Sequence, residues 1–497
     1  MYLLGYDIGS SSVKAALYNT ETGQREGVVQ YPELELEIIS LHPGWAEQHP
    51  EVWWDCVCKA TQRLLQTTGV DPDDIVSIGI AYQMHGLVLV DREGHVLRPS
   101  IIWCDSRAIE IGNDALNHLG KEKCLTHYLN SPGNFTASKL KWVKDNEPAV
   151  YSRIHKIMLP GDYIAMKLTG NIQTTVSGLS EGILWDFKDN SIARDLLEYY
   201  GIDEGFIPEI VDTFSIHGKV SKVAAESTGL SQRTMVSYRA GDQPNNAVSL
   251  GVYKPNEVAA TGGTSGVVYG ISDRYSYDRE SRINGFAHVN HSPPDIRVGI
   301  LLCINGAGIQ YSWIKHQIAK EGISYNDMEH MLGSIPVGAD GLRIIPFGNG
   351  AERMLTNKET GAQINNLQFN RHTTAHIYRA AIEGIAFSFV YGLGIMKELG
   401  IDTSVIKVGN DNLFQSAVFS STISNLMNCE IQVINTTGAI GAAKGSGMAS
   451  GIFASFSEAF EKNELVKTYS PGNTNGAYKH AYQAWNDDLK KLIKHQH

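Results

Sequence analysis

The sequence contains few cysteines, and their spacing favours neither a cross-linked nor a zinc-stabilised fold. There are six cysteines in 497 residues, and only Cys56 and Cys58 lie close together. Disulfide frameworks and paired zinc half-sites both need a more regular arrangement than this. We therefore expect free thiols, as in cytoplasmic proteins.

An excess of positive charge is also missing. The chain carries 42 lysines and arginines against 53 aspartates and glutamates, a formal net charge of -11. This balance argues against a general nucleic-acid-binding protein, whereas a local basic pocket for a phosphorylated ligand stays compatible with it. We expect no nucleic-acid partner.

Neither a secretory leader nor a membrane span is indicated. Met1 runs directly into an apolar strand pattern with no basic segment ahead of it, which favours a cytoplasmic location. The longest uncharged stretches, such as residues 299–314, contain Asn305, Gln310 and several glycines. They are typical of buried core segments rather than of membrane helices, so we expect no membrane partner.

The length and composition predict two globular domains. A chain of 497 residues exceeds the size at which one hydrophobic core is usual. Its content of 42% hydrophobic and 19% charged residues is that of a folded protein without broad disorder.

The first thirteen residues predict a strand, a tight turn and a returning strand. An apolar run ends in Asp7 and is followed by Gly9, Ser10, Ser11 and Ser12. A turn of this kind directs backbone N–H groups and small hydroxyls into one concavity that can cradle a phosphate. Asp7 at the strand end is placed to meet a metal on that phosphate. A plain β-hairpin is the alternative.

The same layout returns in the second half of the chain. An apolar strand from residue 257 leads into a turn of glycine, threonine and serine at residues 262–266, and an apolar strand follows. Two such hairpins about one domain apart suggest a duplicated fold whose turns face each other across a cleft. The pair is more specific than either turn alone.

Polar residues gather where two predicted strands end. Met84 and His85 lie in a cluster of amide, thioether and imidazole groups after one apolar run, and Trp103 ends the neighbouring strand. Such clusters at strand ends are where α/β proteins commonly bind ligands. A structural histidine with satisfied hydrogen bonds is the alternative.

Asp242 is the candidate acid of the first half. Residues 241–246 interrupt an apolar pattern and begin a helix, where the backbone dipole favours an ionised carboxylate. Capping of that helix by Asp242 stays open as a second interpretation. Further on, the predicted helix at residues 414–426 and a glycine-rich helix from residue 436 suit either a flat ligand such as a purine or tight helix packing.

These motifs together resemble the FGGY carbohydrate kinase family, within the actin-like ATPase superfamily. The resemblance covers almost the whole chain, and its parts occur in the order DIGSSSVKA, WAEQHPEVWW, QMHG, WCDSR, LPGDYIAMKLTG, GDQPNNA and TGGTSG, followed by the glycine turn before Phe414. Within the family, the combination of QMHG, WAEQHPEVWW and LPGDYIAMKLTG is most similar to the xylulokinases.

The resemblance implies an α/β fold with two ribonuclease-H-like domains facing each other across a central cleft. Residues 1–246 would bind the sugar and supply the first phosphate turn and the catalytic aspartate. Residues 247–497 would supply the second phosphate turn and bind adenosine. The implied activity is ATP- and Mg²⁺-dependent phosphorylation of the terminal hydroxyl of a ketopentose, with D-xylulose as the best single choice.

The resemblance also assigns roles to individual residues. Asp242 would be the general base, and Asp7 would help to hold Mg²⁺. The sugar would be lined by Met84, His85, Trp103, Asp242 and Gln243. The nucleotide would be bound by Gly9, Ser10, Ser11, Ser12, Lys14, Gly262, Gly263, Thr264, Ser265, Gly409, Asn410 and Asn412.

Three departures from the family pattern keep other substrates open. The turn at Gly409, Asn410 and Asp411 stands where consecutive glycines are usual, so the adenosine contact there can differ. Gln243 after the base resembles glycerol kinases, and QMHG also occurs in kinases of longer ketoses. Glycerol, L-xylulose, ribulose and sedoheptulose are therefore alternatives. A sugar-sensing pseudokinase and a non-kinase actin-like ATPase are less favoured, and a homodimer stays open.

Overall fold

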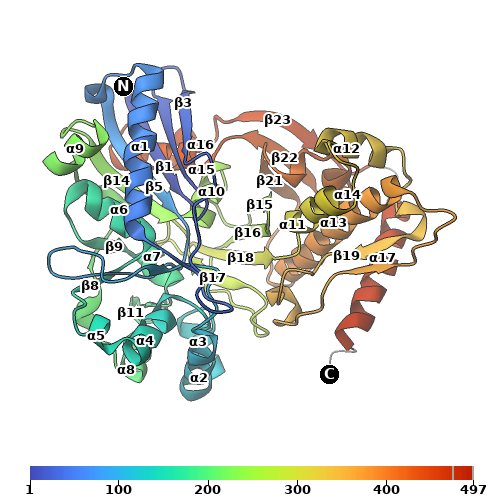
Figure 1. Cartoon of the computed structure of the whole chain (residues 1–497), viewed down its shortest axis with the longest axis horizontal. Helices are drawn as coiled ribbons and strands as arrows, with labels where there is room; N and C mark the ends of the chain where they lie inside the picture. The colour runs from blue at the N-terminus through green and yellow to red at the C-terminus, as the bar shows by residue number, and fades with distance from the viewer. Residues whose placement is uncertain (473–474, 495–497) are drawn as a thin grey trace.

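The computed structural model describes residues 1–472 and 475–494, and Figure 1 shows them as two α/β halves side by side. The N-terminus lies at the outer top of the first half, and the C-terminus lies at the bottom of the second. Each half is built on a large mixed sheet. The predicted α/β fold class with two domains is confirmed.

The first sheet has the strand order β13-β14-β5-β1-β2-β3. Its strands are β1 (Tyr2–Ile8), β2 (Val13–Asn19), β3 (Gln24–Tyr31), β5 (Ile75–Tyr82), β13 (Phe214–Lys219) and β14 (Met235–Gly241). β1, β5 and β14 are parallel, whereas β1, β2 and β3 form an antiparallel meander. Parallel strands bring their carboxyl ends to one edge, so β1, β5 and β14 all end beside the first turn.

The second sheet has the order β17-β18-β16-β15-β21-β22-β23 and repeats this plan. Its strands are β15 (Val258–Gly262), β16 (Gly266–Ser272), β17 (Asn284–Ala287), β18 (Val298–Ile304), β21 (Val405–Gly409), β22 (Glu430–Asn435) and β23 (Glu464–Tyr469). β15, β21 and β22 are parallel, and β15, β16 and β18 are antiparallel neighbours. The duplication predicted from the two turns is therefore present in the strand order as well.

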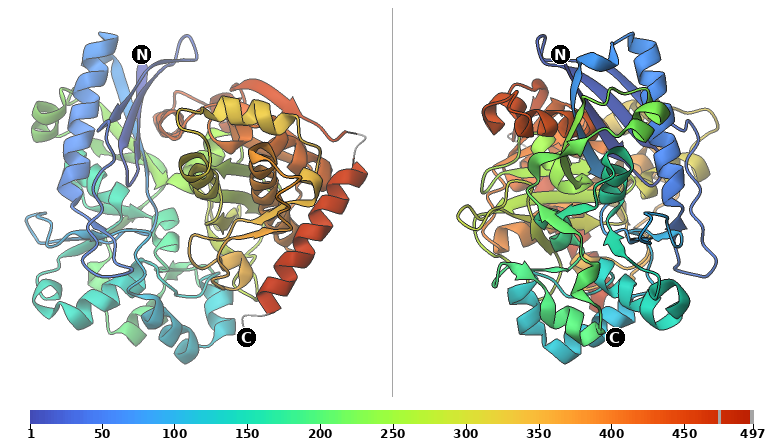
Figure 2. Two further views of the ribbon diagram at one scale, coloured as in Figure 1. Left: turned by 45° about the vertical axis from the view of Figure 1, so that its right-hand side comes forward. Right: turned by 90° about the vertical axis from the view of Figure 1, so that its left-hand side faces the viewer.

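Some helices cover the faces of the two large sheets, and others form a group below the first sheet, as Figures 1 and 2 show. They are α1 (Pro50–Thr68), α2 (Ile109–Leu119), α3 (Lys121–His127), α4 (Thr136–Asn146), α5 (Pro148–Tyr151), α6 (Pro160–Thr169), α7 (Val176–Glu181), α8 (Arg194–Tyr200), α9 (Lys222–Thr228), α10 (Asp242–Ser249), α11 (Gly308–Gln317), α12 (Tyr325–Gly333), α13 (Thr374–Glu398), α14 (Ala417–Met427), α15 (Gly438–Ala449), α16 (Phe456–Phe460) and α17 (Asn475–Lys494). Short two-stranded ladders complete the fold: β4 (Glu47–Gln48) with β7 (Ser100–Ile101), β6 (Val88–Val90) with β8 (Lys156–Met158), β9 (Gln173–Thr175) with β12 (Glu209–Val211), β10 (Trp185–Asp186) with β11 (Ser191–Ile192), and β19 (Arg343–Ile345) with β20 (Gln363–Asn365).

α13 is the helix around which the second half packs. By length and apolar composition it could cross a membrane, but 83% of its most apolar window is buried inside the protein. Its side chains Phe387 and Phe389 contact aromatic residues of α17 and α14. A helix that is apolar on all sides and enclosed in this way is a core helix.

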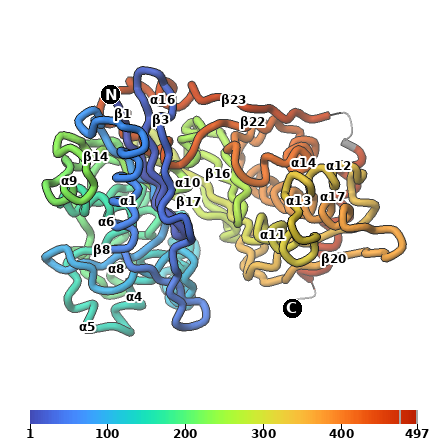
Figure 3. The backbone as a smooth tube through the Cα atoms, turned by 45° about the horizontal axis from the view of Figure 1, so that its top comes forward, coloured from blue at the N-terminus to red at the C-terminus, as the bar shows by residue number. Residues whose placement is uncertain are grey.

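The glycine-rich helix α15 packs on the first sheet although it follows β22 of the second sheet in the chain. Figure 1 shows α15 and α16 in red among the blue and green strands of the first half, and in Figure 3 the chain then returns to the second sheet as β23. A Cβ atom on Gly5 of β1 would lie 1.8 Å from the Ala439 carbonyl oxygen. Tight helix packing, rather than a purine surface, is therefore the role that the structure gives to this helix.

The predicted helix at residues 414–426 is present, but its predicted start is wrong. Leu413–Gln415 form a short 3₁₀ helix, and α14 begins only at Ala417. The Asn412 side chain accepts a hydrogen bond from the Phe414 N–H, and the Ser416 hydroxyl accepts one from the Phe419 N–H. Two successive caps thus divide the single predicted helix into a 3₁₀ helix and α14.

Candidate active site

The first turn joins β1 to β2, as predicted. The Gly9 N–H donates to the Ser12 carbonyl oxygen at 3.0 Å, and Asp7 pairs with Lys14 across the hairpin. The Gln48 side chain donates from Nε2 to the Ser10 carbonyl oxygen at 2.6 Å. Two carbonyls of the turn are thus already engaged by donors of the protein itself.

Asp242 and Asp7 form an acidic pair at the edge of the first sheet. Asp242 is the first residue of α10, whose N-cap is Gly241, so capping is not the role of its side chain. Burial and then the charge of Asp7 raise the pKa of Asp242 to about 7. Burial also raises the pKa of Asp7, which Lys14 lowers and Asp411 raises further. Two desolvated carboxylates that repel each other suit a proton acceptor beside a cation site.

His85 lies in the loop after β5 and is held in one tautomer by a backbone carbonyl of α7. The residue has a φ of +63°, and its Nδ1 lies 2.8 Å from the Glu181 carbonyl oxygen. Burial, followed by the charge of Lys139, lowers the pKa of His85 to about 3, so the ring is neutral. Because a carbonyl only accepts, Nδ1 carries the proton and Nε2 keeps a lone pair for a ligand hydroxyl.

Lys139 of α4 ties together the two loops that carry the predicted sugar residues. Its buried ammonium donates to the His85 carbonyl oxygen at 3.0 Å and to the Ile102 carbonyl oxygen at 2.9 Å. Burial lowers the pKa of Lys139 to about 8. The sequence analysis missed this residue, although a lysine on the apolar face between Ala137 and Leu140 was a readable signal.

Trp103 lies over the first turn with 49% of its surface exposed. Its Nε1 is 3.5 Å from the Ser10 hydroxyl oxygen. The following residues are anchored, because Arg107 pairs with Asp105 at 2.7 Å and with Glu47 at 2.6 Å. An exposed indole on an anchored loop is available to stack against a ligand.

The second turn lies between β15 and β16, where Gly262 pairs with Gly266. The carbonyls of Gly263 and Thr264 accept from the N–H groups of Gly308 and Ile309 at 3.1 and 3.0 Å. As in the first turn, carbonyls of the turn accept hydrogen bonds from other segments of the protein. The exposed Thr264 and the half-buried Ser265 stay accessible.

Asn412 connects the second turn to the turn after β21. Its Oδ1 accepts from the Gly262 N–H at 3.4 Å, and its Nδ2 donates to the Thr261 hydroxyl at 3.3 Å. Asn410 is exposed in the same turn, and Asp411 is the residue whose charge acts on Asp7. The predicted nucleotide residues of the second half therefore lie together and approach the first half at Asp7.

Glu181 is a second residue that the sequence analysis missed. Its side chain is 1% exposed, and its Oε1 has no hydrogen-bond partner among the described residues. Burial and then the charge of Asp242 raise its pKa well above the usual value for glutamate. A Cβ on Gly241 would lie 2.7 Å from Glu181 Oε2, which places this acid directly behind the catalytic candidate.

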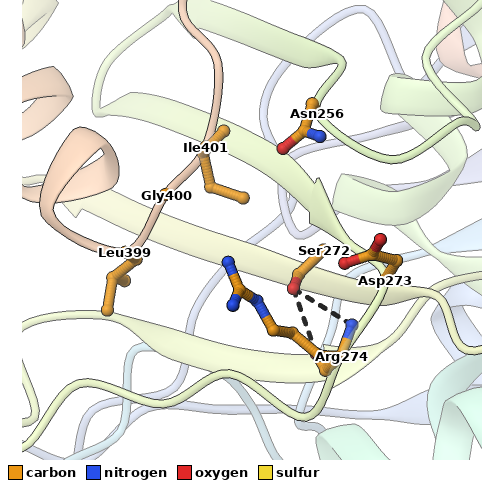
Figure 4. Close-up of a pocket in the computed structure, with 7 residues that line it drawn as sticks. All are labelled: Asn256, Ser272, Asp273, Arg274, Leu399, Gly400 and Ile401. Carbon is orange, nitrogen blue, oxygen red and sulfur yellow. Dashed lines mark hydrogen bonds between the residues drawn. The ribbon is translucent and has the colours of Figure 1, made fainter.

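The cavity in Figure 4 lies elsewhere in the second half. It measures about 300 Å³ and is lined by Asn256, Ser272, Asp273, Arg274, Leu399, Gly400 and Ile401. Ser272 there exchanges hydrogen bonds with the backbone of Arg274, as Figure 4 shows, and its hydroxyl lies 2.8 Å from the Ser276 hydroxyl. None of the predicted site residues lines this cavity, so it is not part of the candidate site.

The comparisons with known proteins agree over both halves. Residues 2–249 match the N-terminal domain of the FGGY family of carbohydrate kinases, and residues 258–450 match its C-terminal domain. The chain is 28% identical to a xylulose kinase of Staphylococcus xylosus, with 85% of this chain and 87% of the relative covered. It is 30% identical to the L-xylulose/3-keto-L-gulonate kinase of Escherichia coli, with 100% and 96% covered.

Solved structures agree on the fold. A xylulose kinase from Rhodospirillum rubrum superposes with a TM-score of 0.87 at 24% identity, with 99% of each chain covered. A glycerol kinase from Plasmodium falciparum superposes with a TM-score of 0.88 at 19% identity, with 99% of this chain and 98% of the other covered.

Proposed function

The chain belongs to the FGGY family of carbohydrate kinases, and we propose that it phosphorylates the terminal hydroxyl of a ketopentose, D-xylulose, to give D-xylulose 5-phosphate. It is an ATP-dependent sugar kinase. The observation that carries the proposal is the acidic pair Asp7 and Asp242 together with the two turns of glycine and hydroxyl residues. Phosphoryl transfer needs in-line placement and charge stabilisation more than covalent help, and this arrangement can provide both.

In this proposal Asp242 accepts the proton of the attacking sugar hydroxyl. Met84, His85, Trp103 and Gln243 bind the sugar, with the lone pair on His85 Nε2 accepting from one of its hydroxyls. The two turns, with Lys14, bind the ATP phosphates through Gly9, Ser10, Ser11, Ser12, Gly262, Gly263, Thr264 and Ser265. Gly409, Asn410 and Asn412 contact the adenosine.

Asp7 would hold Mg²⁺, which would neutralise charge on the ATP phosphates. The residues fit a hard divalent cation, because Asp7 is a desolvated carboxylate whose neighbours include the acids Asp242 and Asp411. We expect Asp7→Asn to raise the Mg²⁺ concentration for half-maximal activity by about 10-fold or more. Titration of activity with Mg²⁺ at fixed ATP measures this. An unchanged Mg²⁺ requirement would exclude Asp7 from the cation site.

The kinase should lose activity on the acid side at a higher pH than an ordinary aspartate would cause. Only ionised Asp242 accepts a proton, and its pKa is raised to about 7, so kcat/KM for the sugar should fall as the pH drops below that value. Without the shift the fall would begin near pH ~4. A profile that stays flat down to about pH 5 would contradict the assignment of Asp242.

A coupled ADP-release assay over a panel of sugars tests the substrate. We expect the largest kcat/KM with D-xylulose. L-Xylulose is the second candidate, since a relative of 30% identity is an L-xylulose/3-keto-L-gulonate kinase. Ribulose, sedoheptulose and glycerol complete the panel. If no sugar raises ATP turnover above the background with water, the kinase proposal fails.

Three expectations from the sequence stay predictions. The cytoplasmic location and the homodimer are open to fractionation and to light scattering. The boundary between residues 246 and 247 falls within α10, and limited proteolysis would test where the two domains separate.

A further inference from the structure

Arg353 of the second half faces the aromatic wall beside His85. It begins the short 3₁₀ helix Arg353–Leu355, and its guanidinium carbon lies 5.8 Å from the centre of the Phe135 ring. The Phe135 ring lies 4.9 Å from the His85 ring, and both pack against Phe286 of β17. A cation from the second half thus reaches the residues that the first half offers to the sugar.

The guanidinium of Arg353 forms no hydrogen bond or ion pair with any residue in 1–472 or 475–494. The adjacent acid does not neutralise it, because the Glu352 carboxylate accepts from the N–H groups of Asn305 and Gly306 at 3.0 and 2.8 Å. Arg353 is only half-exposed, and burial lowers its pKa, yet arginine stays charged in proteins. A partly buried guanidinium that no described residue engages in a hydrogen bond keeps its N–H donors available to a ligand oxygen.

The neighbourhood indicates which end of the substrate Arg353 would meet. Its charge acts on the pKa of His85, whereas the pKa of Asp242 is set by burial, Asp7 and Gln243. Cys303 of β18 lies near both residues, since Arg353 and Asp242 both act on its pKa. Its contact with Phe135, whose ring lies 4.9 Å from the His85 ring, places Arg353 on the His85 side of the site.

We propose that Arg353 binds oxygen atoms of the sugar at the end remote from the phosphorylated hydroxyl, so that both halves of the protein recognise the sugar. This inference rests on the proposed function. Arginine has five donors and no acceptor, so Arg353 suits a carbonyl or hydroxyl oxygen of the sugar. Neutral His85 offers a lone pair, so it suits the proton of a neighbouring hydroxyl. The same donors would also bind the carboxylate of a sugar acid.

Steady-state kinetics of Arg353→Met, Arg353→Gln and Arg353→Lys test the proposal. Loss of a charge-assisted hydrogen bond should raise KM for the preferred ketose about 10- to 100-fold in the Met and Gln variants. The KM of the Lys variant for the ketose should lie between that of the wild type and those of the Met and Gln variants. In all three variants the KM for ATP should stay within about twofold of the wild-type value. Arg371→Met is the matched control, because Arg371 is an exposed arginine of the same half paired with Asp340.

Parallel assays with a sugar acid distinguish the two oxygen sources. If Arg353 binds a ketose oxygen, the wild type should have the higher kcat/KM for the neutral ketose. If Arg353 binds a carboxylate, the wild type should have the higher kcat/KM for the sugar acid, and Arg353→Met should lower kcat/KM more for the sugar acid than for the ketose. An unchanged KM for every accepted sugar in folded Met and Gln variants would overturn the role of Arg353 while leaving the kinase proposal intact. A wild type that phosphorylates no sugar would overturn the proposed function itself.

Discussion

Replacing Asp242 with asparagine should lower kcat by about 10²–10⁴-fold while the protein still binds its sugar. Asparagine keeps the shape of the side chain at the start of α10 but cannot accept the proton of the attacking hydroxyl. The ADP-release assay gives kcat, and isothermal calorimetry gives sugar affinity without turnover. Asp145→Asn, at an exposed ion pair of α4, is the control and should leave both quantities unchanged.

The stability of the same variant separates a catalytic role from a structural one. Burial and Asp7 both disfavour the charge on Asp242, so removing that charge should leave the melting temperature unchanged or raise it. A structural aspartate would show the opposite result, with a lower melting temperature and a parallel loss of sugar binding. Full turnover in Asp242→Asn would remove Asp242 from the role of base.

The parts of the site that the sequence predicts are those made by local chain geometry. The turns at Gly9 and Gly262 follow from small residues between apolar strands, and the sequence pattern suffices because each hairpin closes on itself. Asp242 follows from a strand that ends and a helix that begins. In each case the residues that decide the structure are neighbours in the chain.

The parts that the sequence does not predict depend on contacts between distant segments. Lys139 donates to the carbonyls of His85 and Ile102, and Gln48 donates to the carbonyl of Ser10, and backbone carbonyls leave no mark in the side-chain pattern. Glu181 and Arg353 become visible as candidates only when their missing partners can be checked against the whole fold. The packing of α15 on the first sheet is hidden for the same reason, since the helix and the sheet are far apart in the sequence.

Replacing Gly79 with alanine should lower the free energy of unfolding by about 3 kcal/mol, the upper end of the usual cost of overpacking. A Cβ on Gly79 of β5 would lie 1.9 Å from the Ala442 carbonyl oxygen of α15 and 3.2 Å from the Tyr238 ring. The oxygen belongs to helix backbone and cannot rotate away, so β5 and α15 must move apart. Differential scanning calorimetry and urea unfolding would measure the loss.

Gly394→Ala is the matched control for this change. Gly394 lies inside α13, where an added Cβ would meet no atom within 4 Å, so alanine should stabilise the helix by about 0.5–1 kcal/mol. The two changes should alter the free energy of unfolding in opposite directions because the added methyl group meets different surroundings. Glycine is intrinsically less favourable than alanine in both a strand and a helix, so intrinsic preference alone would stabilise both variants. Equal effects of the two changes would show that α15 does not need the close approach.

A shift of α15 should also displace the acidic pair Asp7 and Asp242. The packing of this helix should therefore affect activity as well as stability. A Cβ on Gly438, the first residue of α15, would lie 2.7 Å from Asp7 Oδ2 and 2.8 Å from Asn246 Oδ1, so the start of the helix lies against the proposed cation site. Gly79→Ala should therefore raise the Mg²⁺ requirement at temperatures where the protein is still folded. An unaltered requirement in a destabilised variant would mean that α15 stabilises the first sheet without positioning Asp7.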